Sequence, residues 1–251
     1  MISLRTIIAI ALLLRVLLSL CVVYIISDSN QFYAGDSFSY LQTANELLSS
    51  RKFSDHINSN VSVRPGYPLL LIPGIVLGRL LLMTISMQII LSCLSVFLVY
   101  RTAHVLFDNE QIASFCALGY AIEPLSIYWT NKIMTETLFT TLCILFLYLL
   151  LSYFKTSKTM YNMLSAIVLA ASAYVRPVNY YFIYLCNILM IIWAISDKKY
   201  RNIRFKACII FLVLSLSLVG IWVIRNGIST GFYVFSGYEG INWYFLKLHQ
   251  F

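Results

Sequence analysis

The residues of this chain that could carry acid–base chemistry are few and lie next to apolar segments. Asp36 stands in the stretch YAGDSFSYLQTA, and Glu136 stands in NKIMTETLF. A carboxylate beside a substrate hydroxyl could accept its proton during a transfer reaction. Each acid also has a purely structural explanation, because a carboxylate in the first turn of a helix caps it and complements its dipole. For Asp36 taken alone, the helix cap is the preferred interpretation.

Three arginines occupy comparable positions near the ends of apolar segments. Arg64 stands in SVRPGYP, Arg176 in YVRPVNYYF and Arg225 in WVIRNGISTGFYVFSG. A long arginine side chain at such a place commonly snorkels to the lipid headgroups. A guanidinium also binds phosphate through two parallel hydrogen bonds, and a lipid phosphate would lie at that depth. The two acids and three arginines together predict one site, because ionisable residues within membrane segments are usually functional.

The segments that must position these residues are long and apolar. Of 251 residues, 60% are hydrophobic and 11% are charged, whereas a soluble domain carries about 25% charged residues. We therefore predict an all-α integral membrane protein, with residues 1–251 forming a single transmembrane domain and no soluble C-terminal domain. About seven spans are expected, since about 20 helical residues cross a bilayer. They cover residues 6–26, 81–100, 111–129, 136–154, 161–175, 178–195 and 207–224.

The basic residues orient these predicted spans. The first span is expected to stay uncleaved, because Arg15 interrupts its apolar core and no typical cleavage site follows. A dense basic cluster lies between the last two spans and is typical of a cytoplasmic loop: Lys198, Lys199, Arg201, Arg204 and Lys206. This cluster places the N-terminus in the cytoplasm. It also explains much of the formal charge of +8 without a nucleic-acid partner.

The long first outer loop, residues 27–67, contains a helical pattern. Apolar residues recur at helical spacing after Asp36, and polar residues lie opposite them: Tyr40, Leu41, Ala44, Leu47 and Leu48, against Gln42, Asn45 and Glu46. We predict an amphipathic helix over residues 37–50, parallel to the membrane surface. Residues 68–80 are apolar but broken by proline and glycine, which predicts a short interfacial or re-entrant segment that does not span.

Metal and thiol chemistry have little support in the sequence. All six cysteines lie within apolar runs, no CxxC pair occurs, and no Cys/His cluster has metal-ligand spacing. The sequence also lacks a glycine-rich nucleotide-phosphate loop. No metal site and no cofactor are therefore expected, although a divalent cation shared by Asp36 and Glu136 stays open.

The order of the segments resembles the polytopic GT-C-type glycosyltransferases. Within that type it resembles the family 39-like group, which includes protein O-mannosyltransferases and the lipid A aminoarabinose transferase. The matching motifs are Asp36 followed by Tyr40, RPGYP at 64–68, VFLVYRTAHVLF at 96–107, EPLSIYWTNKIMTETLF at 123–139, Arg176–Pro177, and GIWVIRNGISTGFYVFSGYEGINWYF at 220–245. Members of this group usually continue beyond the point that corresponds to Phe251, with more spans and often a soluble outer domain.

The resemblance implies a glycosyltransferase that takes a sugar from a polyprenyl phosphate. The acceptor would be a hydroxyl of a glycan, a lipid or a protein, at the outer face of a bacterial inner membrane. Asp36 would be the catalytic base or orient the acceptor, and Glu136 would be a second acidic residue of the site. The implied substrate-binding residues are Tyr40, Arg64, Tyr67, Arg176 and Arg225, with the arginines near the donor phosphate.

Two other functions stay open at this point. A transporter or flippase for a lipid-linked sugar would use the same arginines to bind phosphate without chemistry, but it should contain paired broken spans or inverted repeats. A truncated, non-catalytic relative of the glycosyltransferases is the other alternative. Substitution of Asp36 separates these hypotheses, because an enzyme should tolerate it far less than a transporter or a scaffold.

Overall fold

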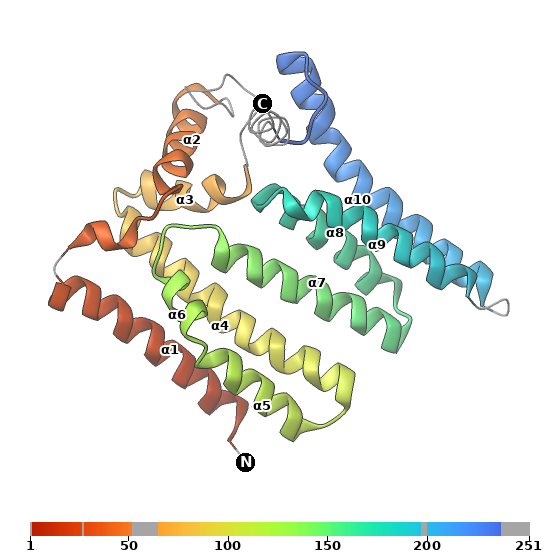
Figure 1. The fold of residues 1–251 in the computed structure, drawn as a ribbon, viewed down its shortest axis with the longest axis horizontal. Helices are drawn as coiled ribbons and strands as arrows, with labels where there is room; N and C mark the ends of the chain where they lie inside the picture. Colours follow the sequence, from red (N-terminus) through yellow and green to blue (C-terminus); the bar gives the residue numbers. More distant parts are fainter. Residues whose placement is uncertain (1, 27, 52–64, 197–199, 237–251) are drawn as a thin grey trace, which may run out of the picture.

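A computed structural model describes residues 2–26, 28–51, 65–196 and 200–236 (Figure 1). All regular structure within these residues is helical, and they contain no strand. The helices are α1 Leu4–Leu20, α2 Ser37–Ser50, α3 Gly66–Val76, α4 Leu80–Phe107, α5 Glu110–Ala121, α6 Pro124–Thr130, α7 Glu136–Thr156, α8 Thr159–Val175, α9 Val178–Ile195 and α10 Arg201–Thr230. A π-helical segment, Cys21–Ile26, extends α1, and a short 3₁₀ helix covers Ser29–Phe32.

Five of the described helices are long and apolar enough to cross a membrane. They are α1 with its extension, α4, α7, α9 and α10. The apolar helix α8 has 17 residues, and α3 has only 11. The chain is thus an all-helical membrane protein, in agreement with the sequence. The shortness of α3 also confirms that the segment after residue 67 does not span.

The segment expected as one span over residues 111–129 is not a single helix, because α5 ends at Ala121 and α6 begins at Pro124. The carboxylate of Glu123 accepts hydrogen bonds from the backbone N–H groups of Leu125, at 2.9 Å, and of Ser126. Pro124 has no N–H to donate to a preceding turn and is well suited to the first position of a helix. This capped proline start divides the apolar segment into two short helices.

Arg15 of α1 is fully buried and hydrogen-bonds to residues on both sides of this break. Its Nη1 donates to the carbonyl oxygen of Ala121 at 2.9 Å, and its Nη2 donates to Ser126 Oγ at 3.1 Å. Its Nε donates to Ser92 Oγ of α4 at 2.6 Å. A helix end leaves carbonyl groups without intrahelical partners, so the guanidinium satisfies a group that the break exposes. One side chain therefore joins α1, α4, α5 and α6.

Different turns and short helices lie at the two ends of the bundle (Figure 1). The α4–α5 and α7–α8 turns lie at one end, where Lys155 Nζ is 3.0 Å from Asp108 Oδ1. The hydrogen bond from Lys155 lowers the pKa of the Asp108 carboxyl. The helices α2 and α3 and the α8–α9 junction lie at the opposite end, and α7 lies between α4 and α8. Asp36, Glu136 and Arg176 therefore share one end of the bundle.

The helix predicted over residues 37–50 is confirmed as α2. Its orientation parallel to the membrane stays a prediction. Within the protein, Glu46, expected on the polar side, is 8% exposed, whereas Leu48 of the apolar stripe is 42% exposed. The difference arises because α2 packs on α3 through Tyr40 and Tyr67, whose ring centroids are 5.1 Å apart. A contact between helices, rather than the periodicity alone, decides which side of α2 is buried.

Candidate functional site at one end of the bundle

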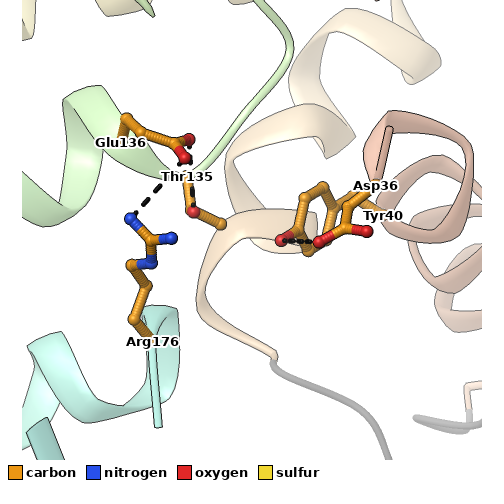
Figure 2. Close-up of polar contacts among 5 residues, drawn as sticks. All are labelled: Asp36, Tyr40, Thr135, Glu136 and Arg176. Atoms are coloured by element: carbon orange, nitrogen blue, oxygen red, sulfur yellow. Dashed lines mark hydrogen bonds and ion pairs between the residues drawn. The ribbon is translucent and has the colours of Figure 1, made fainter. Parts of the chain in front are cut away.

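Asp36 immediately precedes α2, yet its side chain makes no capping hydrogen bond to that helix. Its backbone is already in the right-handed helical region, with φ −87° and ψ −1°. Asp36 Oδ2 instead accepts a hydrogen bond from the Tyr40 hydroxyl at 3.5 Å (Figure 2). Because the carboxylate is exposed and does not cap the helix, the structural explanation preferred for this residue alone does not describe it.

Glu136 begins α7 and pairs with Arg176 from the end of α8. Glu136 Oε1 lies 3.6 Å from Arg176 Nη1, and the two side chains are 19% and 40% exposed. Glu136 Oε2 accepts from the hydroxyl of Thr135 at 3.5 Å (Figure 2). The guanidinium of Arg176 also lies over the ring of Phe139, 5.5 Å from its centroid. The acid and the arginine therefore form a partly solvated pair.

The Arg–Pro sequence explains why Arg176 sits at this corner. A residue before proline avoids the helical region, and Arg176 has φ −137° and ψ 118°. The helix α8 therefore ends at Val175, and α9 begins at Val178 directly after Pro177. The extended backbone at Arg176 is held by the N–H of Asn179, which donates to its carbonyl at 3.2 Å.

Gln88 of α4 holds the loop that leads into Glu136. Its Nε2 donates to the carbonyl oxygens of Thr130, at 2.9 Å, and Lys132, at 2.8 Å. Its Oε1 accepts from the hydroxyl of Tyr67 at 2.8 Å. Gln88 and Tyr67 are fully buried, so every one of these bonds replaces contacts with water that the groups have lost. Loop 131–135 is thereby fixed to α3 and α4.

The same loop is bonded to the residues that flank Asp36. The hydroxyl of Ser37 donates to the carbonyl oxygen of Ile133 at 2.7 Å. The N–H of Ile133 donates to the carbonyl oxygen of Phe32 at 2.8 Å. Both bonds are made three residues before Glu136. The segment from Phe32 to Ser37 and the start of α7 are thus connected by hydrogen bonds.

Tyr67 contacts Tyr40, the hydrogen-bond partner of Asp36, and lies near Glu136. Its ring meets the ring of Tyr40 edge to face, with an interplanar angle of 69°. Burial raises the pKa of the Tyr67 hydroxyl, and the nearby Tyr40 and Glu136 raise it further. Tyr67 therefore stays protonated at neutral pH and acts as a hydrogen-bond donor, not as a base.

A cavity of about 280 Å³ lies beside Glu136. Its lining comes from α4, α5, α6, α7 and the α5–α6 break: Ser92, Tyr120, Glu123, Leu125, Ser126, Trp129, Glu136, Thr137 and Thr140. Asp36 and Arg176 do not belong to this lining. Glu136 thus touches both the cavity and Arg176, whereas Asp36 reaches the same region only through the bonded loop.

The chain matches one known protein family. The model of a family described as dolichyl-phosphate-mannose-protein mannosyltransferase matches residues 74–224, more than half of the chain. The chain belongs to this family. It is therefore a member of the GT-C-type membrane glycosyltransferases, as the resemblance in the sequence implied. No curated protein and no solved structure matches the chain.

The region matched to the mannosyltransferase family contains Glu136 and Arg176, and Asp36 precedes it. Arg225 follows it by one residue, on α10. The described contacts of Arg225 are with the Trp222 ring, 4.9 Å from its centroid, and with Asn226 Oδ1 at 3.0 Å. Arg64 lies outside the described residues. Of the predicted substrate-binding arginines, only Arg176 is described in contact with an acid of the site.

Several residues that build this site carry no local signal in the sequence. A Cβ atom at Gly66 would lie 2.8 Å from Val175 Cγ2 and 2.9 Å from the carbonyl carbon of Tyr174. Glycine is therefore what lets α3 approach the end of α8 beside Arg176. Gln88 was likewise not predicted, because its partners lie 42 and 44 residues away along the chain. Within the described residues, no three His, Cys, Asp or Glu side chains gather as metal ligands would.

Proposed function

We propose that this chain is an inverting glycosyltransferase that moves a sugar from a polyprenyl phosphate to a hydroxyl acceptor. The observation that carries the proposal is the bonded loop 131–135, which connects the segment of Asp36 to the Glu136–Arg176 pair. An exposed carboxylate that does not cap its helix would supply the base, and the acid–arginine pair connected to it by this loop would supply a phosphate-binding group. Family membership makes glycosyl transfer the reaction to assign to them.

In the proposed step, the acceptor oxygen attacks the anomeric carbon of the donor sugar. The bond between that carbon and the phosphate oxygen breaks, and the polyprenyl phosphate leaves with the electron pair. The acceptor hydroxyl gives its proton to the carboxylate of Asp36, which acts as general base. Tyr40, whose hydroxyl donates to Asp36, would orient this carboxylate.

Arg176 would stabilise the negative charge of the leaving phosphate. A guanidinium has five N–H donors, so pairing with one carboxylate oxygen leaves donors for a phosphate. The 40% exposure of its side chain leaves it accessible to a bound donor. Glu136 would hold the guanidinium in position, and Arg64 and Arg225 would complete the phosphate contacts.

The proposed site faces the outer side of a bacterial inner membrane, with the N-terminus in the cytoplasm. Its acceptor would be a hydroxyl of a glycan, a lipid or a protein. We propose no cofactor and no resident metal. A cation shared by Asp36 and Glu136 remains the alternative, and transfer measured with and without EDTA separates the two.

The deciding experiment is a transfer assay with the purified chain in lipid nanodiscs. Radiolabelled polyprenyl-phosphate mannose is the first donor to supply, since the family description names a mannosyl donor. Other polyprenyl-phosphate sugars and crude envelope acceptors complete the assay. Label should move to an acceptor with the wild-type chain. Donor that crosses proteoliposome membranes without transfer would instead support a flippase. If the donor is neither transferred nor moved across the membrane, a non-catalytic scaffold is the better account.

A further inference from the structure

The chain reverses direction directly after α10, at Gly231. The helix ends at Thr230, and Gly231 has a φ of 80°, in the left-handed region that glycine adopts readily. Its N–H donates to the carbonyl oxygen of Gly227 at 2.9 Å. A Cβ atom at Gly227 would lie 2.4 Å from the ring of Tyr233, so this ring rests on the backbone of α10. Residues 232–236 therefore run back beside the helix, and we call them the return segment.

Asn226 of α10 binds the return segment through its side-chain amide. The residue is buried, and its Nδ2 donates to the carbonyl oxygens of Val234, at 2.9 Å, and Phe235, at 3.3 Å. Its Oδ1 accepts a hydrogen bond from Arg225 Nη1 at 3.0 Å. Because the oxygen of an amide accepts and its nitrogen donates, the arginine fixes which end of the amide faces the return segment. The Arg–Asn sequence thus holds the residues that follow α10 in place.

Phe235 of the return segment is buried against two tyrosine rings. Its ring is stacked on that of Tyr180, with the centroids 4.9 Å apart and an interplanar angle of 3°. It meets the ring of Tyr174 edge to face, with the centroids 5.6 Å apart. The hydroxyl of Tyr174 also donates to the carbonyl oxygen of Leu218 on α10. Three rings and one hydrogen bond therefore join the return segment and α10 to α8 and α9.

The two tyrosines lie on either side of the corner that carries Arg176. Tyr174 precedes Arg176 by two residues at the end of α8, and Tyr180 follows it by four at the start of α9. Within the corner, the N–H of Tyr180 donates to the carbonyl oxygen of Pro177 at 2.9 Å. A change in the angle between α8 and α9 would move at least one of the two rings relative to Phe235. Since aromatic pairs prefer particular distances and angles, these contacts favour one geometry of the corner.

We infer that Phe235 is a positioning residue, which holds the α8–α9 corner so that Arg176 keeps its place beside Glu136. The ion pair between Arg176 and Glu136 is partly exposed, and such a pair contributes little to fixing a side chain. The buried contacts of Phe235 are a stronger restraint. Both Phe235 and Asn226 lie beyond the residues matched to the family, 74–224. The inference rests on the proposed function only in the task given to Arg176, which is to bind the donor phosphate.

The first measurement follows the corner itself and needs no donor. Spin labels are attached at Val178→Cys and Leu82→Cys, two exposed positions on α9 and α4, in a full chain without its native cysteines. Pulsed EPR in nanodiscs then gives the distribution of distances between the labels. Phe235→Leu keeps an apolar side chain but removes both ring contacts, and Asn226→Ala removes two hydrogen bonds to the return segment. Phe232→Leu is the matched control, the same change in the same segment at a residue that is 65% exposed.

We expect Phe235→Leu and Asn226→Ala to shift or broaden the distance distribution, and Phe232→Leu to leave it as in the wild type. Thermal unfolding identifies the variants that stay folded, and either of the first two is sufficient if the other does not fold. A wild-type distribution in the folded variants would overturn the inference. An equal change in Phe232→Leu would also overturn it, because the effect would then not depend on the buried ring.

The second measurement asks whether Phe235 acts through Arg176. Phe235→Leu should weaken the binding of polyprenyl phosphate about 2- to 12-fold, the contribution of one aromatic pair. The same change in an Arg176→Ala chain should cause no further loss, because the residue that it positions is gone. If the two losses multiply in the double variant, Phe235 acts independently of Arg176, and the positioning role is overturned.

The two measurements also separate the inference from the proposed function. A corner that moves in Phe235→Leu, together with wild-type binding of polyprenyl phosphate in Arg176→Ala, rejects the proposed phosphate site and leaves the restraint on the corner intact. Binding that depends on Arg176 but not on Phe235 rejects the inference alone.

Discussion

The hydroxyl of Ser37 lies 2.7 Å from the carbonyl oxygen of Ile133 and donates a hydrogen bond to it. The two residues are 96 positions apart in the chain. Each lies near an acidic residue of the site in the sequence: Ser37 directly follows Asp36, and Ile133 precedes Glu136 by three positions. A displacement of the segment that carries Asp36 would therefore be transmitted to the start of α7.

Replacing Asp36 with asparagine should abolish most of the transfer activity. The change keeps size and polarity but removes the proposed base, and general-base catalysis contributes about 10²–10⁴-fold. Donor binding should be retained, which a titration with polyprenyl-phosphate mannose checks. Asp28→Asn is the control, since Asp28 is an acid of the same loop that accepts from the N–H of Asn30. Wild-type turnover in Asp36→Asn would favour a carrier or a scaffold.

Replacing Glu136 with glutamine should impair function much more than stability. The pair with Arg176 is partly exposed, so its loss should change the free energy of unfolding by about 1 kcal/mol or less. Misplacing a charged contact to phosphate costs about 1.5–3 kcal/mol, which is roughly a 10- to 150-fold loss of kcat/KM. Glu110→Gln alters the first residue of α5 at the opposite end and should leave kcat/KM unchanged. Equal effects of both substitutions would refute the role of Glu136.

Replacing Gln88 with leucine should destabilise the end of the bundle that carries the site. The change leaves Tyr67 Oη and the carbonyls of Thr130 and Lys132 buried without this partner, at about 1–3 kcal/mol for each unsatisfied group. Tyr67→Phe removes only one of the three bonds and should lower Tm less. Thermal unfolding in nanodiscs compares the two variants. A Tm in Gln88→Leu equal to the wild-type value would contradict the bonding described here.

Replacing Gly66 with alanine should separate α3 from α8 and lower the transfer rate. The new Cβ would meet backbone atoms of Tyr174 at 2.9–3.0 Å, which cannot move as a flexible side chain could. Gly119→Ala, in α5, is the matched control, because a Cβ there meets nothing within 4 Å. Alanine favours helix over glycine by about 1 kcal/mol, so the control should keep or raise Tm. Tm and turnover are measured for both variants. Equal values for Gly66→Ala and Gly119→Ala would contradict the close contact described at Gly66.

The orientation of the chain can be checked by labelling single cysteines in a background without the native ones. Ser39→Cys lies on the exposed side of α2, and Thr159→Cys begins α8 at the other end of the bundle. An impermeant thiol reagent added outside intact cells should label Ser39→Cys and spare Thr159→Cys. The reverse pattern would place the acidic residues in the cytoplasm and contradict the proposed outer site.

Local patterns in the sequence were sufficient to predict most of the helices, but not the break between α5 and α6. The helical spacing after Asp36 predicted α2 with its observed limits, and long apolar runs predicted α4, α7, α9 and α10. The break at Glu123–Pro124 was missed because apolar residues continue on both sides of it. Its signal was an acid directly before a proline, the residues that cap and begin α6.

The candidate site was predictable as a set of residue types, not as a geometry. Asp36, Glu136 and Arg176 were identified from motifs, and the structure brings the last two together. Their support comes from Gln88, Ser37 and Gly66, whose partners are distant in the sequence. Periodicity reports which side of a helix is buried in an average environment. It does not report a hydrogen bond to one particular loop or a contact that only a glycine permits.

Arg15 has a consequence for the biogenesis of the protein. An arginine near the middle of a membrane helix raises the cost of insertion by the translocon by about 2.5–3.5 kcal/mol. Its partners Ser92, Ala121 and Ser126 are synthesised 77, 106 and 111 residues later. While the ribosome translates that interval, α1 carries a charge without the groups that later surround it. We therefore expect α1 to stay at the lateral gate, or beside an insertion chaperone, until the α5–α6 break emerges.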